Sequence, residues 1–136
     1  MEQAMTHRIV SYSVRNDGGA WLSPNFRVKE FACRDGSDKI LVDLRLIHIL
    51  QQIRDYFGRP VAINSAYRTR EYNAKIGGAK ASQHCLGTAA DITVSGVSPS
   101  AVAAYAETLL SGAGGIGRYA NFTHIDVREN KARWAG

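Results

Sequence analysis

Residues 82–91 read Ser82-Gln83-His84-Cys85-Leu86-Gly87-Thr88-Ala89-Ala90-Asp91. A tight turn at Gly87 would fold this stretch back on itself and bring His84 close to Asp91, because glycine adopts turn conformations that other residues avoid. The small residues at positions 87, 89 and 90 would allow close packing around a bound ion. The stretch therefore suggests a metal site with a glycine turn between two of its ligands.

A second polar cluster follows at Phe122-Thr123-His124-Ile125-Asp126-Val127. In a strand, His124 and Asp126 point to the same face. Two histidines and one carboxylate, with water in the fourth position, form a recurrent catalytic zinc set. Spacing alone supports equally well two separate structural histidines and an Asp91 that caps a turn. The helical HExxH signature of many zinc peptidases is absent.

The flanking pattern predicts an α+β fold. Apolar residues recur at helical spacing over residues 43–57, and Gly58-Arg59-Pro60 ends that helix. A second helix is expected over 100–111 and one or two helical turns over 69–75. Strands are expected at 8–14, 61–67, 90–94, 116–119 and 122–127. Without a regular βαβ rhythm, we expect a small antiparallel sheet with helices packed on one side.

Length and charge narrow the function classes. The 136 residues are the size of a single domain, so we expect one domain over 1–136 and a monomer. The net charge of +5 favours polyanions, but the basic residues are scattered and no RNA-binding signature accompanies them, which argues against nucleic acid. No apolar run reaches the ~18 residues of a membrane span.

The N-terminal sequence favours synthesis in the cytoplasm, which in turn bears on the state of the two cysteines. Residues 1–8 carry no basic patch followed by an apolar run, so no secretory signal is visible. In a reducing compartment Cys33 and Cys85 are expected to be free, partly buried thiols.

Several ordered motifs resemble one known family. They are Ser65-x-Tyr67-Arg68, Ser82-x-His84-x-x-Gly87-x-Ala89-x-Asp91, Gly115-x-Gly117-x-Tyr119 and Phe122-x-His124-x-Asp126-x-Arg128. Together they resemble the zinc D-alanyl-D-alanine carboxypeptidases and endopeptidases, in the short single-domain type of bacteria and phages. The resemblance runs from about Phe26 to Trp134, within a family-like core of about 24–136, and implies a hedgehog/DD-peptidase-like fold.

The resemblance also implies roles for individual residues. It assigns a single zinc ion to His84, Asp91 and His124, and it places Arg68 on the substrate carbonyl or its developing oxyanion. A fixed guanidinium suits that role because it stabilises charge that appears only in the transition state. Ser82 is expected to bind substrate or to orient a ligand. The implied substrate is a peptidoglycan stem or cross-link peptide, which a phage endolysin would reach after its release from the cell.

The sequence departs from the family at the general base. Where several members carry Glu three residues before the last histidine, this chain has Asn121; where others carry His five residues before it, this chain has Tyr119. Tyr119 is a candidate donor to an oxyanion or leaving group. Asp126 is the nearest ionisable group, either as the base or as a carboxylate that orients a metal-binding histidine. The alternative function is therefore a weakly active or inactive zinc-containing module that binds the cell wall.

The remaining candidates are expected to be structural. His7 lies near the N-terminus and His48 within the long helix, so neither is expected to bind metal. Trp21 and Trp134 are expected to serve core or edge packing rather than to bind sugar.

Overall fold

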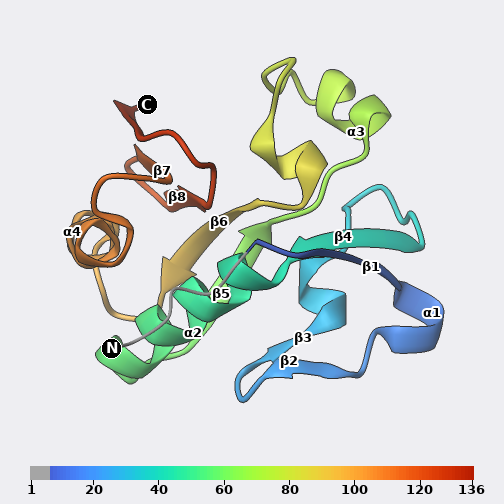
Figure 1. The fold of residues 1–136 in the computed structure, drawn as a ribbon, viewed down its shortest axis with the longest axis horizontal. Helices are drawn as coiled ribbons and strands as arrows, with labels where there is room; N and C mark the ends of the chain where they lie inside the picture. The colour runs from blue at the N-terminus through green and yellow to red at the C-terminus, as the bar shows by residue number, and fades with distance from the viewer. Residues whose placement is uncertain (1–6) are drawn as a thin grey trace.

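A five-stranded sheet with the strand order β5-β6-β8-β7-β9 forms the centre of the computed structural model, which describes residues 7–136 (Figure 1). Its strands are β5 (Val61–Ser65), β6 (Ala89–Val94), β7 (Gly115–Arg118), β8 (Thr123–Asp126) and β9 (Ala132–Ala135). All neighbouring pairs are antiparallel except β7 and β9, which are parallel. The expectation of a purely antiparallel sheet was therefore wrong at this edge. The loop after β8 carries the chain past β7, so β9 runs antiparallel to β8 but pairs with β7.

Two helices cover one face of this sheet, as expected. Helix α2 (Leu44–Phe57) begins at the cap Asp43 and ends at Gly58, and α4 (Pro99–Leu110) begins at the cap Ser98. Both pack on β6 and on each other. Alternate strand residues point into the layer between sheet and helices, where Ile92, Ile116 and Ile125 are fully buried. The α+β class is therefore confirmed.

The N-terminal third adds two small two-stranded sheets beside the main sheet (Figure 1). They are β1 (Ile9–Ser13) with β4 (Lys39–Asp43), and β2 (Trp21–Ser23) with β3 (Phe26–Arg27); α1 (Val14–Asp17) and the 3-10 helix η1 (Val28–Phe31) lie between them in sequence. Phe26, Val28 and Phe31 join the same buried cluster as the helix α2 and sheet residues. The two small sheets thus share one continuous hydrophobic core with the main sheet.

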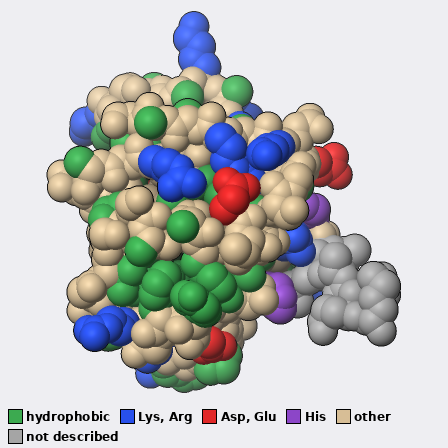
Figure 2. All heavy atoms as spheres, turned by 90° about the vertical axis from the view of Figure 1, so that its left-hand side faces the viewer, with side chains coloured by type: hydrophobic (Ala, Val, Ile, Leu, Met, Phe, Trp, Pro, Cys, Tyr) green, Lys and Arg blue, Asp and Glu red, His purple; other side chains and the backbone are tan. Residues whose placement is uncertain are grey.

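The surface beside α4 carries a gathering of hydrophobic side chains, which Figure 2 shows among scattered Lys and Arg residues. Tyr56 of α2 stacks on Tyr105 of α4 with ring centroids 3.8 Å apart, and Tyr56 is 63% exposed. This stacked pair joins the two helices at the surface.

Across residues 7–136, no helix combines the length and the apolar character needed to cross a membrane.

The segment between β5 and β6 carries α3 (Arg70–Lys75) and the 3-10 helix η2 (Gln83–Leu86). Gly87 ends η2 in the left-handed conformation, with φ of +82°. Its carbonyl accepts a hydrogen bond from the backbone N–H of Asp43, and a Cβ at this position would lie 2.5 Å from the carbonyl oxygen of Leu41. The predicted glycine turn is therefore present, and it packs tightly against β4.

We expect Gly87→Ala to destabilise the protein more than Gly58→Ala. Both glycines are left-handed, so each substitution costs about 1–2 kcal/mol of backbone strain. Only at Gly87 does the new methyl group collide with backbone, which adds about 1–3 kcal/mol. Urea unfolding followed by circular dichroism measures the two losses, and equal losses would contradict the close packing described here.

Candidate metal centre

One row of residues crosses the whole sheet on the face that α2 and α4 leave open. Pairing places Ser65 opposite Asp91, Asp91 opposite His124, His124 opposite Gly117, and Gly117 opposite Trp134. Directly paired residues share a face, so this row points away from the helix-covered core. The sheet register therefore brings together polar residues that are far apart in the sequence.

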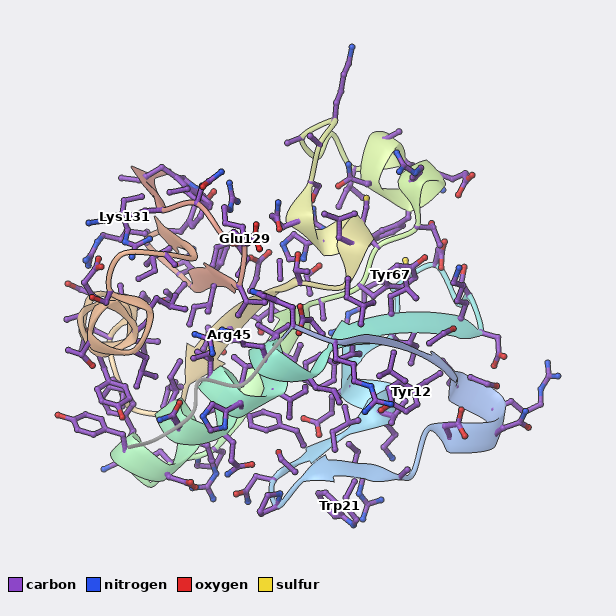
Figure 3. All side chains as sticks on the ribbon, in the orientation of Figure 1. Tyr12, Trp21, Arg45, Tyr67, Glu129 and Lys131 are labelled. Carbon is purple, nitrogen blue, oxygen red and sulfur yellow. The ribbon has the colours of Figure 1, made fainter. Side chains whose placement is uncertain are left out.

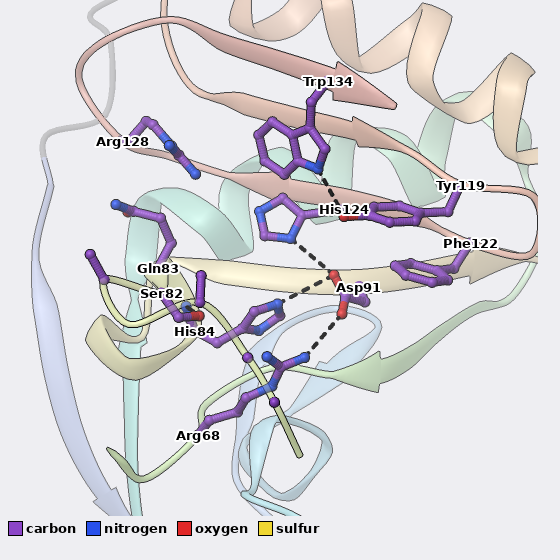
Figure 4. A pocket seen from close by; sticks show the side chains of 14 residues that line it. Arg68, Ser82, Gln83, His84, Asp91, Tyr119, Phe122, His124, Arg128 and Trp134 are labelled. Carbon is purple, nitrogen blue, oxygen red and sulfur yellow. Dashed lines mark hydrogen bonds and ion pairs between the residues drawn. The ribbon is translucent and has the colours of Figure 1, made fainter. Parts of the chain in front are cut away.

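The three predicted ligands converge at the middle of this row (Figure 4). The carboxylate oxygen Oδ1 of Asp91 lies 3.0 Å from Nδ1 of His124 and 3.3 Å from Nε2 of His84. One candidate ligand atom from each residue lies within 4.8 Å of the others, and all three residues are buried. His84 reaches the row from η2, whose turn at Gly87 directs the chain back into β6.

The second nitrogen of each histidine is held by an acceptor. His84 Nδ1 donates to the carbonyl oxygen of Ala66 over 2.7 Å, which leaves Nε2 facing Asp91. His124 Nε2 lies 2.8 Å from Oδ2 of Asp126, which leaves Nδ1 facing Asp91. Metal-binding histidines usually donate their other N–H in this way, because it fixes the tautomer and the ring orientation. The donor set therefore fits one zinc ion.

Electrostatics favour ionised carboxylates around His124. Burial acts to raise the pKa of Asp91, but hydrogen bonds from His124 and His84 outweigh it and hold the pKa well below its usual range. The pKa of Asp126 is lowered in the same way, against burial, by His124 and Arg128. Burial acts to lower the pKa of His124, but its two carboxylate neighbours leave that pKa raised. A negatively charged carboxylate thus faces each of the two nitrogens of the His124 ring.

Asp126 is completely buried behind His124. Oδ1 accepts from Nε of Arg128 at 2.8 Å and from the Arg128 backbone N–H, while Oδ2 accepts from Nη2 of Arg128 at 2.7 Å and contacts His124. A Cβ on Gly115 would collide with this carboxylate, so the glycine makes room for it. Sequence reasoning gave Arg128 no role, although its spacing of two residues from Asp126 and four from His124 was a signal that the three lie together.

Arg68 reaches the same carboxylate ligand from the other side. Its Nη2 lies 3.4 Å from Oδ2 of Asp91, its Nε donates to Oγ of Ser65 at 3.1 Å, and its Nη1 donates to Oδ1 of Asn73 at 3.1 Å. Asn73 is buried and donates in turn to the carbonyl oxygen of Ala79. Sequence reasoning missed Asn73, whose signal was a polar residue within the short helix that precedes Gly77-Gly78. The guanidinium is thus fixed beside the metal ligands.

Arg68 and the three candidate ligands line a cavity of about 530 Å³. Ser82 also lines it and caps η2, where its Oγ accepts from the backbone N–H of His84 at 3.2 Å. The opposite wall is aromatic: Tyr119 stacks on Phe122 at 4.3 Å between ring centroids, and Trp134 lies 4.9 Å from the His124 ring. Trp134 therefore lines the cavity and contacts a metal ligand, which the expectation of core or edge packing did not include.

Other candidates lie outside this cavity. Asn121 is exposed and lines a separate cavity of about 260 Å³ with Ile92 and Val102. His7 contacts the buried Asp43 at 2.9 Å, and His48 is exposed on α2. Both histidines lie apart from the metal ligands, as expected.

Trp21 and the two cysteines also lie apart from the metal ligands. Trp21 is 57% exposed at the far edge of the molecule, with the Arg27 guanidinium 4.2 Å from its ring centroid (Figure 3). Cys33 is buried and Cys85 half-buried, and both thiols are free, as expected; burial raises the pKa of Cys85.

Two histidines and an aspartate in one cavity, beside a fixed arginine, form a donor set that fits a metal-dependent hydrolase. The sequence model of one family, Peptidase M15, matches residues 24–126. The chain belongs to this family, the zinc D-Ala-D-Ala carboxypeptidases, which confirms the resemblance seen in its motifs. A comparison with curated proteins found no match.

We expect Asp126→Asn to weaken zinc binding by about tenfold to a hundredfold, the usual effect of losing the partner of a metal-binding histidine. The amide preserves the shape but removes the negative charge that holds the His124 N–H. Competition with a chromogenic chelator measures the affinity. Asp55→Asn, on the exposed face of α2, is the matched control; equal zinc affinities of the two variants would exclude an orienting role for Asp126.

Proposed function

We propose that this protein is a zinc-dependent peptidase that hydrolyses stem or cross-link peptides of peptidoglycan, as a D-Ala-D-Ala-type carboxypeptidase or endopeptidase. The carrying observation is the convergence of His84, Asp91 and His124 in one cavity beside Arg68. Membership of the M15 family and the α+β fold support the same conclusion and favour a hedgehog/DD-peptidase-like arrangement.

The residues around the metal ligands suit acyl transfer. Bound zinc would supply a Lewis acid that polarises the scissile carbonyl and lowers the pKa of water toward about 7. Arg68 is held by Ser65 and Asn73, so its guanidinium needs no reorganisation to meet negative charge on the substrate oxygen. Tyr119 provides a second hydrogen-bonding group on the opposite wall. We propose that Arg68 and Tyr119 donate hydrogen bonds to the substrate oxygen in the transition state. Ser82 would orient His84 and contact the substrate.

For Asp126 we favour the orienting role over the role of base. Its oxygens already accept from Arg128 and contact His124, and it is not among the residues that line the cavity. A base must lie within hydrogen-bond reach of the proton that it takes, directly or through one water. The buried position behind the imidazole supports control of His124 instead.

A second candidate function rests on the scarcity of carboxylates in the cavity lining. Among the residues within 7–136 that line the cavity, Asp91 is the sole carboxylate, and it is itself a candidate ligand. A domain that keeps zinc but lacks a proton acceptor would bind wall peptides without cleaving them. Zinc that co-purifies and sacculi that retain the protein, with no new amine termini after prolonged incubation, would identify this binding module.

The setting of the reaction is part of the proposal. We infer a protein that is made in the cytoplasm, reaches the anionic wall after release, and acts as a monomer without nucleic acid. The net charge of +5 supports attraction to the wall.

We expect zinc removal and ligand substitution to abolish hydrolysis of purified sacculi. Chelation should stop the release of amine termini, and added zinc should restore it. His84→Ala and His124→Ala should also stop this release, because each substitution removes one donor from the proposed zinc site. The matched control is His48→Ala, which alters an exposed histidine on α2. Full activity of the His84→Ala, His124→Ala double variant would exclude the proposed reaction.

We expect Arg68→Ala to lower kcat by about a hundredfold to a thousandfold, the range seen when one oxyanion donor is removed. Arg68→Lys should recover little of this, because an ammonium group cannot meet Ser65, Asn73 and Asp91 with one planar fork. Steady-state kinetics on a synthetic stem peptide measure the effect at equal zinc content. A lowered zinc content with an unchanged kcat per bound zinc would show that Arg68 supports the metal site instead.

A further inference from the structure

Tyr119 and Trp134 form a hydrogen-bonded pair in the wall of the metal cavity. The indole Nε1 of Trp134 donates to the hydroxyl oxygen of Tyr119 over 2.8 Å. Both side chains line the cavity, and Figure 4 shows the hydroxyl of Tyr119 on the side where Trp134 and His124 lie. Within residues 7–136, Trp134 is the sole protein partner of this hydroxyl.

The chemistry of the pair fixes the direction of the hydrogen bond. An indole N–H can donate and never accepts, whereas a phenol hydroxyl does both. Trp134 therefore occupies a lone pair of the Tyr119 oxygen and leaves the O–H proton free for another acceptor. A tyrosine without this neighbour could rotate its hydroxyl to accept from water or from the substrate.

The surrounding backbone holds both rings in place. Trp134 lies over Gly117, where a Cβ would come within 2.6 Å of the indole, and its ring contacts His124. Tyr119 stacks on Phe122 on one side, and the backbone of Gly136 lies so close to its ring that a Cβ there would collide with it. The two rings thus have little freedom to turn, which makes the donor direction a fixed property of the cavity.

We propose that Trp134 is a positioning residue that sets the Tyr119 hydroxyl as a hydrogen-bond donor to a substrate oxygen in the metal cavity. The inference rests on the proposed peptidase function and names the residue that controls one of its donors. Arg68 approaches Asp91 from one wall and Tyr119 occupies the other, so an oxygen between them would meet donors on both sides. Such an arrangement selects substrates and transition states that are rich in acceptors, such as a peptide carbonyl that becomes an oxyanion.

The first test needs neither zinc nor substrate. The chain has two tryptophans, so a ¹⁵N–¹H spectrum shows two indole signals, and Trp134→Phe identifies the signal of Trp134 by its loss. Tyr119→Phe should shift the Trp134 indole signal strongly and leave the Trp21 signal in place, because Trp21 is distant and exposed. An unmoved Trp134 signal would overturn the proposal at its first step.

The second test is a double-mutant cycle on the zinc-loaded protein. Trp134→Phe and Tyr119→Phe should each lower kcat about tenfold with KM nearly unchanged, as for one neutral hydrogen bond made in the transition state. The double variant should lose no more than Tyr119→Phe alone, because Trp134 acts through Tyr119. Additive losses would assign Trp134 an independent role and overturn the proposal. Trp21→Phe is the matched control, and equal zinc content and melting temperature show that each variant is folded.

A ligand-binding measurement separates this inference from the proposed function. A phosphinate analogue of an alanine dipeptide presents tetrahedral oxygens, and calorimetry with the zinc-loaded variants should give the same cycle in Kd: about tenfold for each single variant and no more for the double. If the wild type cleaves no wall peptide but keeps this cycle, the peptidase function fails and the positioning role stands. If the wild type cleaves peptides but binds the phosphinate as tightly without the Tyr119 hydroxyl, the positioning role fails alone. A wild type that does not bind the phosphinate also overturns it.

Discussion

The pairing of Asp91 with His124 across β6 and β8 is the contact on which the site depends. It places Oδ1 of Asp91 3.0 Å from Nδ1 of His124, and the turn at Gly87 then brings His84 to the same oxygen. Because side chains alternate along a strand, a slip of one residue would turn either ligand into the core. The register is secured by the opposite face, where Ile92 and Ile125 are fully buried. Hydrophobic burial under the helices therefore fixes the geometry of the metal site above them.

The glycines of β7 extend this layer of functional side chains. At Gly115 and Gly117 the strand presents no side chain to the open face, and the space is occupied by the Asp126 carboxylate and the Trp134 indole. Both of these groups contact His124. The Gly115-x-Gly117 motif thus serves packing, and through packing it allows a carboxylate and an aromatic ring to hold one metal ligand from two directions.

Local sequence patterns predicted the elements that are long and regular. The helix over 43–57 was predictable because its apolar spacing, its cap at Asp43 and its left-handed stop at Gly58 agree with one another. Strands β4 and β9 were not predicted, because their strand conformation depends on pairing with β1 and β7, which lie far from them in the sequence. The parallel pairing of β7 with β9 was also not predicted, because it depends on the path of the loop after β8, which no local sequence pattern indicates.

The candidate ligands emerged from residue chemistry and motif order, whereas their supporting residues required the fold. Asn73, Arg128 and Trp134 act through contacts with residues that other elements contribute or that a turn brings near. The spacing of residues in the sequence does not indicate that Trp134 lies beside His124. The two meet because Gly117, which lies between them in the sheet, has no side chain. Sequence therefore locates the candidate ligands, and tertiary structure locates the residues that orient them.

The balance of donors and acceptors in the cavity bears on how the proposed peptidase would accelerate its reaction. Arg68 and Tyr119 supply donors, while the sole carboxylate that the described part of the chain places in the lining is the candidate ligand Asp91. General base catalysis typically contributes about 10²–10⁴ in rate, and a fixed oxyanion donor contributes about 10²–10³. A cavity rich in donors and poor in acceptors would keep the contribution of the oxyanion donor and lose much of the contribution of general base catalysis. Stabilisation of negative charge on the substrate oxygen is accordingly the main means by which this chain's own residues would accelerate peptide hydrolysis.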